Sequence, residues 1–227
     1  MPRFLHDEAK AMLFSPAPPP GIQRAALPPG FVYAQEWVPA LCVDLVYCGS
    51  HNFIGAPIAG YAAERLILTR EAALALGEIQ AELESCGLAL KVFDGYRPQR
   101  AVDHFIAWAQ DPDDLRMRDK YYPRLDKARL FAEGYLVTRS SHSRGSTVDV
   151  SLVDDNGAEL DMGTCFDFFD PRSWPQSRAV GAPQRAHRLL LRSVMQRHGF
   201  VGVAEEWWHF TLREEPFPAT YFDFVIA

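Results

Sequence analysis

Two short segments of the sequence contain residues of the kind that bind a metal ion and activate water. The first segment (SSHSRGSTVD) contains His142 and Asp149, and the second (EWWH) contains Glu206 and His209. Two imidazoles and one carboxylate are a ligand set that leaves a catalytic Zn²⁺ with an open position for water. We therefore predict that His142, Asp149 and His209 bind one Zn²⁺ per chain and that Glu206 acts as the base.

Each segment alone is weak evidence, and its spacing sets a condition on the backbone. His142 and Asp149 are an odd number of residues apart, so on a regular strand they would point to opposite faces. A turn must separate them, and Gly145 can supply one because glycine readily adopts a positive φ. From Thr147 to Leu152 the residues alternate as in a strand. The second segment meets the same condition, so we expect its glutamate at a strand entrance or irregularity, with its histidine on the strand itself.

The other histidines have simpler interpretations as structural residues: His6, His51, His104, His187 and His198. His198 precedes Gly199, where a helix should end, and an imidazole there interacts favourably with the helix dipole. Trp207 and Trp208 could alternate across a strand as core aromatics. We assign one of the two tryptophans to packing and leave the other open.

The elements that must position these residues indicate a mixed α+β fold in a single domain, with a mainly antiparallel sheet carrying the zinc site and helices packed on it. Thr69 can cap a helix with apolar residues at helical spacing and Gly87 as its terminator. Pro98 opens a second helix, and the polar segment 111–130 is expected to be a surface excursion near the site. The remaining predicted elements are a strand over 88–93, a helix over 183–198, and strands over 200–203 and 207–212.

Composition agrees with one enzyme domain. The chain has 227 residues, 48% of them hydrophobic, which is enough for one large core. Its net charge of −6 and the lack of a basic run argue against a nucleic-acid partner. No apolar run is long enough to span a bilayer, and the N-terminus carries acids where a signal peptide would need hydrophobes. We expect no membrane partner and a cytoplasmic location.

A resemblance to a known family rests on several segments together. The order Ser-x-His-x-x-Gly-x-x-x-Asp followed by Glu-x-x-His resembles the zinc D-alanyl-D-alanine carboxypeptidases and dipeptidases. Four further segments resemble the D-Ala-D-Ala dipeptidases of the vancomycin-resistance type: Asp94 to Pro98 (DGYRP), Met162 to Asp167 (MGTCFD), Glu206 to His209 (EWWH) and Tyr221 to Phe224 (YFDF). The likeness runs from Asp44 to Phe224, so residues 1–43 are interpreted as an N-terminal extension and 44–224 as the core.

The resemblance implies further roles, each with a structural alternative. Arg97 is expected to stabilise the oxyanion, or else to form an ordinary salt bridge with Asp94. Ser140 and Asp167 are expected near the substrate ammonium and Tyr47 in the pocket lining. Alternatively, Ser140 caps a turn, Asp167 pairs with an arginine such as Arg172, and Tyr47 belongs to the core.

The cysteines show no Cys-x-x-Cys pair and are expected to be reduced thiols. Cys42 and Cys48 are an even number of residues apart on an expected strand and could share a face. Cys165 falls within the segment that the resemblance places at the substrate pocket, at a position where the family is not expected to require cysteine. An additional metal ligand there is the alternative to an ordinary thiol.

The predicted function is zinc-dependent hydrolysis of the D-alanyl-D-alanine dipeptide to two D-alanines. One alternative is a related peptidoglycan carboxypeptidase or endopeptidase, which would act on long cell-wall peptides and should therefore be exported. A second is a non-catalytic zinc-binding module. Glu206 and Arg97 argue against the module, because a structural zinc site needs neither a base nor an oxyanion donor.

Overall fold

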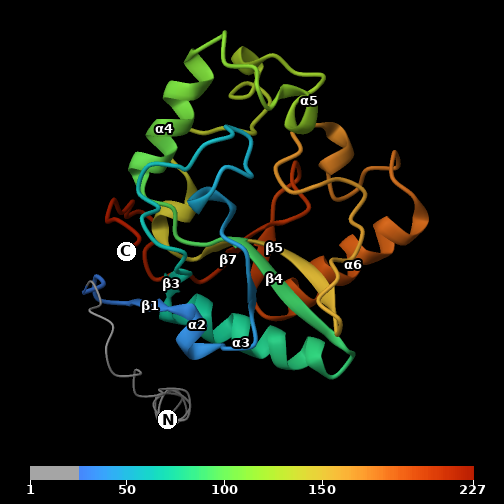
Figure 1. Ribbon diagram of the computed structural model, residues 1–227. Helices are drawn as coiled ribbons and strands as arrows, with labels where there is room; N and C mark the ends of the chain where they lie inside the picture. Colours follow the sequence, from blue (N-terminus) through green and yellow to red (C-terminus); the bar gives the residue numbers. More distant parts are fainter. Residues whose placement is uncertain (1–25) are drawn as a thin grey trace.

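The computed structural model describes residues 26–227 and is drawn in Figure 1. His6 and most of the predicted N-terminal extension lie outside the described residues. The strands are β1 (Phe31–Tyr33), β2 (Cys42–Val43), β3 (Ile67–Thr69), β4 (Leu88–Asp94), β5 (Thr147–Asp154), β6 (Phe200–Gly202) and β7 (His209–Leu212). The α-helices are α2 (Ala34–Trp37), α3 (Arg70–Glu84), α4 (Gln99–Gln110), α5 (Arg118–Tyr121) and α6 (Ala182–Arg197). Short 3-10 helices are η1 (Val46–Cys48), η2 (Lys127–Arg129), η3 (Ser141–Arg144) and η4 (Pro171–Ser173).

A five-stranded sheet with the order β2-β4-β5-β7-β6 lies at the centre, and a separate two-stranded sheet pairs β1 with β3. In the larger sheet β2 and β4 are parallel, and all other neighbouring strands are antiparallel. Helix α3 packs against β4, and α6 packs against β5 and β6. Figure 1 shows α3 below the sheet and α4 with the loops around α5 above it. The mixed α and β fold with a mainly antiparallel sheet is confirmed.

Helix α3 lies between the residues that the sequence predicted as its cap and its terminator. The Thr69 hydroxyl accepts a hydrogen bond from the Ala72 N–H (3.4 Å), which satisfies one of the free donors at the start of the helix. Gly87 follows the helix with a φ of +69°, a conformation that suits glycine. The chain then enters β4 directly. Helix α4 likewise begins directly after Pro98, and α6 ends just before Gly199.

Two details of the predicted strands were wrong. Cys42 lies in β2 but Cys48 lies in η1, so the two thiols do not share one strand face. The strand expected from Trp207 starts only at His209. Trp207 and Trp208 precede it in irregular backbone, and both side chains are buried. The Trp207 indole N–H donates to the Thr164 hydroxyl (2.9 Å), which explains how a buried tryptophan is satisfied there.

The segment 111–130 is more than a surface excursion. Tyr121, Tyr122 and Leu130 are buried and belong to the hydrophobic core. The Lys127 ammonium is also buried, but it donates to the carbonyls of Trp108 (2.9 Å) and Asp111 (2.8 Å) at the end of α4. The ammonium caps these free carbonyls at the end of the helix. The hydrogen bonds offset the free-energy cost of burying its charge. The segment therefore packs on α4 as part of the fold.

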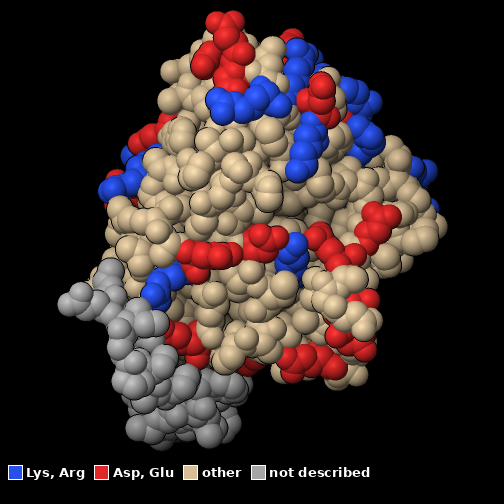
Figure 2. Space-filling model, in the orientation of Figure 1, with Lys and Arg blue, Asp and Glu red and all other residues tan. Residues whose placement is uncertain are grey.

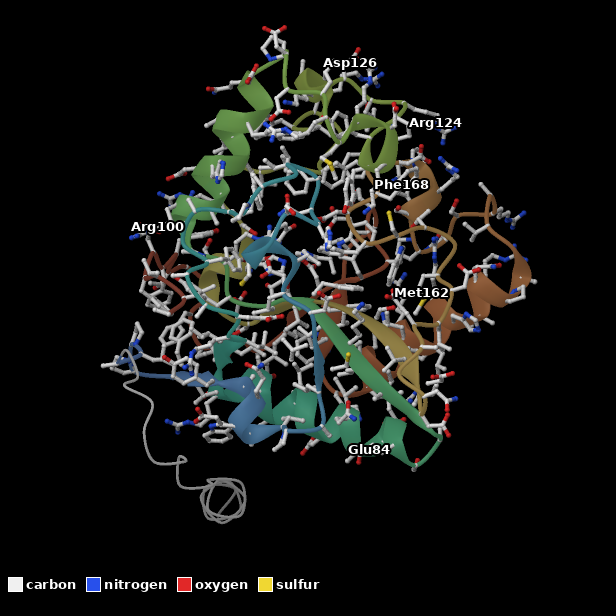
Figure 3. The ribbon with its side chains drawn as sticks, in the orientation of Figure 1. Glu84, Arg100, Arg124, Asp126, Met162 and Phe168 are labelled. Atoms are coloured by element: carbon white, nitrogen blue, oxygen red, sulfur yellow. The ribbon has the colours of Figure 1, made fainter. Side chains whose placement is uncertain are left out.

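The last described residues are held against the start of α4. The Tyr96 ring stacks on Phe224 with centroids 4.0 Å apart, and its hydroxyl donates to the Phe224 carbonyl (3.1 Å). Arg100, labelled in Figure 3, forms an ion pair with Asp223 (2.9 Å) beside the C-terminal segment. The Ile226 N–H donates to the Gly60 carbonyl (2.9 Å). The Tyr96 and Arg100 contacts fix the C-terminal segment to the junction between β4 and α4, and the Ile226 contact joins it to the segment of Gly60.

Charged side chains of both signs form separate groups on the face seen in Figure 2, most of which is uncharged. Basic residues gather in its upper part, over the region of α5, and acidic residues form a band at the level of the sheet. Among residues 26–227, no helix combines the length and the apolar character that a membrane crossing requires.

Candidate active site

The turn between His142 and β5 forms as its sequence requires. Ser140 caps η3, because its hydroxyl accepts a hydrogen bond from the His142 N–H (3.3 Å). Gly145 ends η3 with a φ of +84°, and a Cβ at this position would lie 2.2 Å from the Phe31 ring. Only glycine fits both conditions. The turn brings His142 back over the beginning of β5.

Asp149 and His209 are direct partners across the antiparallel pair of β5 and β7. Side chains of paired residues point to the same face of a sheet and lie close together. The strand register alone therefore brings these two residues side by side, and η3 adds His142 from the sheet end.

The three side chains form a compact cluster. His142 Nε2 lies 3.2 Å from Asp149 Oδ2, and His209 Nδ1 lies 3.1 Å from Asp149 Oδ1. The two imidazole nitrogens themselves are 3.3 Å apart. All the candidate ligand atoms lie within 4.8 Å of one another. His142, Asp149 and His209 are thus a candidate metal site, and two imidazoles with one carboxylate fit a catalytic divalent ion.

The second nitrogen of each imidazole is held by another group. His142 Nδ1 lies 2.7 Å from the Gly95 carbonyl, so it carries the proton and leaves Nε2 facing the cluster. His209 Nε2 lies 3.3 Å from the Ser141 hydroxyl, which leaves Nδ1 facing the cluster. Hydrogen bonds of this kind orient histidine ligands around metal ions. The two rings are therefore arranged so that their free nitrogens converge.

The charge states also suit metal binding. Burial opposes the charge of Asp149, but the neighbouring His142 and His209 outweigh it and hold the pKa of this carboxyl well below its usual range. Burial lowers the pKa of His209, which favours the neutral imidazole. A carboxylate and a neutral imidazole are the forms that bind a cation.

Glu206 lies before β7 in irregular backbone, as expected, with its Oε2 atom 3.7 Å from His209 Nδ1. Burial raises the pKa of its carboxyl well above the ordinary value, and the charges of Asp149 and Asp167 raise it further. A carboxyl with a raised pKa is a better proton acceptor at neutral pH than an ordinary glutamate. Its position beside the cluster and its pKa both suit a base.

Arg97 lies at the junction of β4 and α4 and makes the salt bridge that was its structural alternative. Its Nε donates to Asp94 Oδ2 (2.8 Å), but its Nη2 also contacts Asp149 Oδ2 (3.2 Å). The guanidinium lies against the rings of Tyr47 and Phe105, 5.1 and 5.3 Å from their centroids. Arg97 is therefore fixed by charge and by stacking, within reach of the cluster.

Tyr47 and Asp167 meet from distant parts of the chain. The Tyr47 hydroxyl donates to Asp167 Oδ2 (2.8 Å), and both residues are buried. Asp167 has a φ of +58° and is not paired with Arg172, which binds Asp170 instead. Burial first, and then the charge of Asp149, raise the pKa of Asp167 well above its ordinary value. Asp167 makes no ion pair with another residue of the described chain. A cation placed beside it would stabilise its carboxylate form.

A cavity of about 320 Å³ joins these groups. The predicted site residues that line it are Tyr47, Arg97, Ser140, Asp149, Asp167, Glu206 and His209. His142 completes the cluster from behind, where it is 1% exposed. Trp208 also lines the cavity, whereas Cys165 is exposed, does not line it and is not part of the metal cluster.

Sequence reasoning missed several lining residues. Tyr135, Val137 and Arg139 lie between the segment 111–130 and η3 and contribute one wall of the cavity. They belong to no motif that we identified. The only available signal was their position, directly before the Ser140 to Asp149 segment.

Comparison with known proteins identifies the family of the chain. Residues 28–227 match the family described as D-ala-D-ala dipeptidase. The chain is 41% identical to the D-alanyl-D-alanine dipeptidase of Enterococcus faecalis, over 87% of this chain and 98% of that protein. It is 45% identical to the one of Streptomyces coelicolor, with the same coverage of both chains. A solved structure of the vancomycin resistance D,D-pentapeptidase VanY with Zn(II) aligns with a TM-score of 0.40 and 15% identity, over 67% of this chain and 76% of that one. The chain belongs to the D-ala-D-ala dipeptidase family.

Proposed function

We propose that the protein hydrolyses D-alanyl-D-alanine to two molecules of D-alanine with one Zn²⁺ bound by His142, Asp149 and His209. The observation that carries this proposal is the convergence of these ligand atoms within 4.8 Å beside the carboxylate of Glu206. The names of the two bacterial relatives support the substrate. We place the catalytic core at residues 44–224.

Glu206 supplies the proton transfers of the reaction. When bound, Zn²⁺ provides a Lewis acid and lowers the pKa of water at the site. The Glu206 carboxylate accepts a proton from the attacking water and delivers it to the nitrogen of the leaving D-alanine. Its raised pKa favours both transfers, because the group can hold the proton between the two steps.

Arg97 stabilises the negative charge that develops on the carbonyl oxygen during attack. Its guanidinium is fixed by Asp94 and stacked on aromatic rings, so its orientation is set before the substrate binds. A preorganised donor of this kind costs little reorganisation in the transition state. The contact with Asp149 keeps the guanidinium next to the reacting atoms.

Asp167 binds the free ammonium of the substrate, with Tyr47 and Ser140 beside it in the cavity lining. Burial and the charge of Asp149 raise the pKa of Asp167 although Arg97 lies near, and a substrate ammonium would supply this carboxyl with an ion-pair partner. A cavity of about 320 Å³ leaves room for a small dipeptide. We therefore expect selectivity for substrates with a free amino terminus.

Substrate selectivity tests this proposal. We would measure kcat/KM for D-Ala-D-Ala, L-Ala-L-Ala, N-acetyl-D-Ala-D-Ala and a muramyl pentapeptide at equal zinc loading. Removing one partner of a desolvated charge pair costs about 3–5 kcal/mol, so the N-blocked substrates should react slower by orders of magnitude. Asp167→Asn should abolish this discrimination. Comparable rates on all D,D-substrates would favour the carboxypeptidase alternative, and no hydrolysis by the zinc-loaded protein would favour the non-catalytic module.

A further inference from the structure

The cavity is lined by cations as well as carboxylates, and one cation pairs with no carboxylate of residues 26–227. Arg97 contacts Asp94 and Asp149, and Arg144 forms an ion pair with Glu215 (2.8 Å). Arg139 also lines the cavity, but it makes no ion pair with any residue in the part of the chain that the structure describes. Its side chain is exposed at the cavity, so an incoming anion can reach it.

The Arg139 guanidinium is nevertheless held in place. Its Cζ atom lies 5.1 Å from the centroid of the Tyr221 ring. Arg144 lies near the same ring, 5.7 Å from its centroid, and donates to the Tyr221 hydroxyl (3.5 Å). Stacking on an aromatic ring occupies the face of a guanidinium and leaves the N–H donors at its edge free. These donors match the two oxygens of a carboxylate.

The cavity therefore has a polarity that fits a zwitterion. Its buried carboxyls are Asp149 and Asp167, whereas Arg139 is an exposed guanidinium on the same cavity. A dipeptide whose ammonium contacts Asp167 carries its carboxylate at the opposite end of the molecule. Arg139 directly precedes Ser140, which also lines the cavity.

We propose that Arg139 binds the free carboxylate of the substrate, and so selects peptides in which the residue after the cleaved bond is the C-terminal one. This inference rests on the proposed dipeptidase function. Arg97 and Arg144 are less suited to this contact, because each already shares its donors with a carboxylate. Arg139 acts on binding, since the substrate carboxylate keeps its charge throughout the reaction.

The test compares two substrates that differ only in this charge, D-Ala-D-Ala and D-alanyl-D-alaninamide. For Arg139→Ala we expect kcat/KM for the free acid to fall about tenfold, the low end for a charge-assisted hydrogen bond at an exposed residue. The loss should appear in KM, with kcat changed by less than about twofold, because the contact is equal in ground and transition states. The amide should react equally in both proteins, and Arg139→Lys should recover part of the loss. Arg178→Ala, which removes an exposed arginine outside the cavity, is the matched control.

The outcomes separate this inference from the proposed function. An equal loss on acid and amide would indicate a structural role for Arg139 and overturn the inference. So would an unchanged KM for the acid with full discrimination against the amide, while the dipeptidase proposal would stand. If the zinc-loaded wild-type protein hydrolyses neither substrate, the proposed function fails and this inference fails with it.

Discussion

The two walls of the cavity are built in different ways. On one side, Asp149 and His209 extend from paired strands, and the backbone hydrogen bonds of the sheet set their positions. On the other side, Tyr47 and Asp167 lie in irregular segments and are positioned by a hydrogen bond between their own side chains. The strand wall carries two of the proposed metal ligands, and the loop wall carries two of the residues proposed for substrate recognition.

This difference indicates where each kind of constraint acts. A metal site needs ligand atoms fixed to within a fraction of an ångström, which regular elements provide better than loops. Recognition of a small substrate tolerates a wall that is assembled from loops, provided that its polar groups are satisfied. Substitutions in the strand wall should therefore affect metal binding and turnover. Substitutions in the loop wall should affect selectivity and stability.

The largest effect is expected for the strand wall, from His209→Ala. The variant should lose its zinc and all measurable activity but remain folded, because a domain with this extensive a core does not depend on one metal site. Elemental analysis and circular dichroism check the two parts of this prediction. His51→Ala, at an exposed histidine outside the cavity, is the control and should keep full zinc content. Full zinc occupancy in His209→Ala would remove this residue from the ligand set.

The variant Glu206→Gln should show whether Glu206 acts as the base or binds the metal ion. The amide keeps the shape of the side chain but cannot accept a proton, so kcat should fall by roughly 10²–10⁴ while zinc stays bound. Single-turnover kinetics on protein with measured zinc content checks this. Near-normal kcat would refute the base, and loss of zinc would make Glu206 a ligand instead.

Arg97→Ala should lower kcat by about 10²–10³, the usual effect of losing one oxyanion donor. Arg97→Lys should recover part of that loss, because lysine keeps the charge but cannot contact Asp94 and Asp149 together in the planar geometry of a guanidinium. Steady-state kinetics on both variants gives the comparison. A change in KM alone would reassign Arg97 to substrate binding.

The smallest effect is expected from Asp170→Asn, three residues after Asp167 and outside the cavity lining. Arg124 and the Arg172 N–H contact this buried carboxylate (2.6 and 2.9 Å), and these contacts outweigh burial and hold its pKa below the ordinary value. The substitution should cost about 1–2 kcal/mol of unfolding free energy at pH 7, given that Arg124 is partly exposed. Urea denaturation measures it.

The pH dependence of that cost has a definite sign. Because the pKa of Asp170 is lowered by folding, its carboxylate stabilises the fold above about pH 4, and this contribution is lost as the pH falls through the folded-state pKa. The difference between wild type and Asp170→Asn should thus shrink at pH 3. Asp126→Asn is the control: Asp126 is exposed, forms an ion pair with Arg118 and is labelled with Arg124 in Figure 3, and its substitution should change stability little at either pH. A cost for Asp170→Asn that is equal at both pH values would contradict the assignment.

The elements around the strand wall could be predicted from the sequence because their signals are local. Thr69 and Gly87 mark the ends of α3, and Gly145 marks the turn before β5. The cluster of His142, Asp149 and His209 joins segments 60 residues apart, and its prediction needed the ligand types together with the resemblance.

The loop wall was less accessible, because its contacts join residues far apart in the chain. The hydrogen bond between Tyr47 and Asp167 links positions separated by 120 residues, and no periodic pattern reports it. The resemblance supplied these two residues, and it did not supply Arg139. The late start of β7 after two buried tryptophans was also missed, since packing of the indoles overrides the alternation expected for a strand.

The pairing of Asp149 with His209 has a consequence for how the sheet folds. In a β-strand, a slip of one residue turns every side chain to the opposite face. If β7 slipped against β5, His209 would leave the cluster, and a bound ion would lose a ligand along with the correct pairing. The native arrangement would then bind the ion more tightly than the slipped one. Ion binding would therefore stabilise the native strand pairing by mass action. The ion would thereby act as a check on strand alignment during folding.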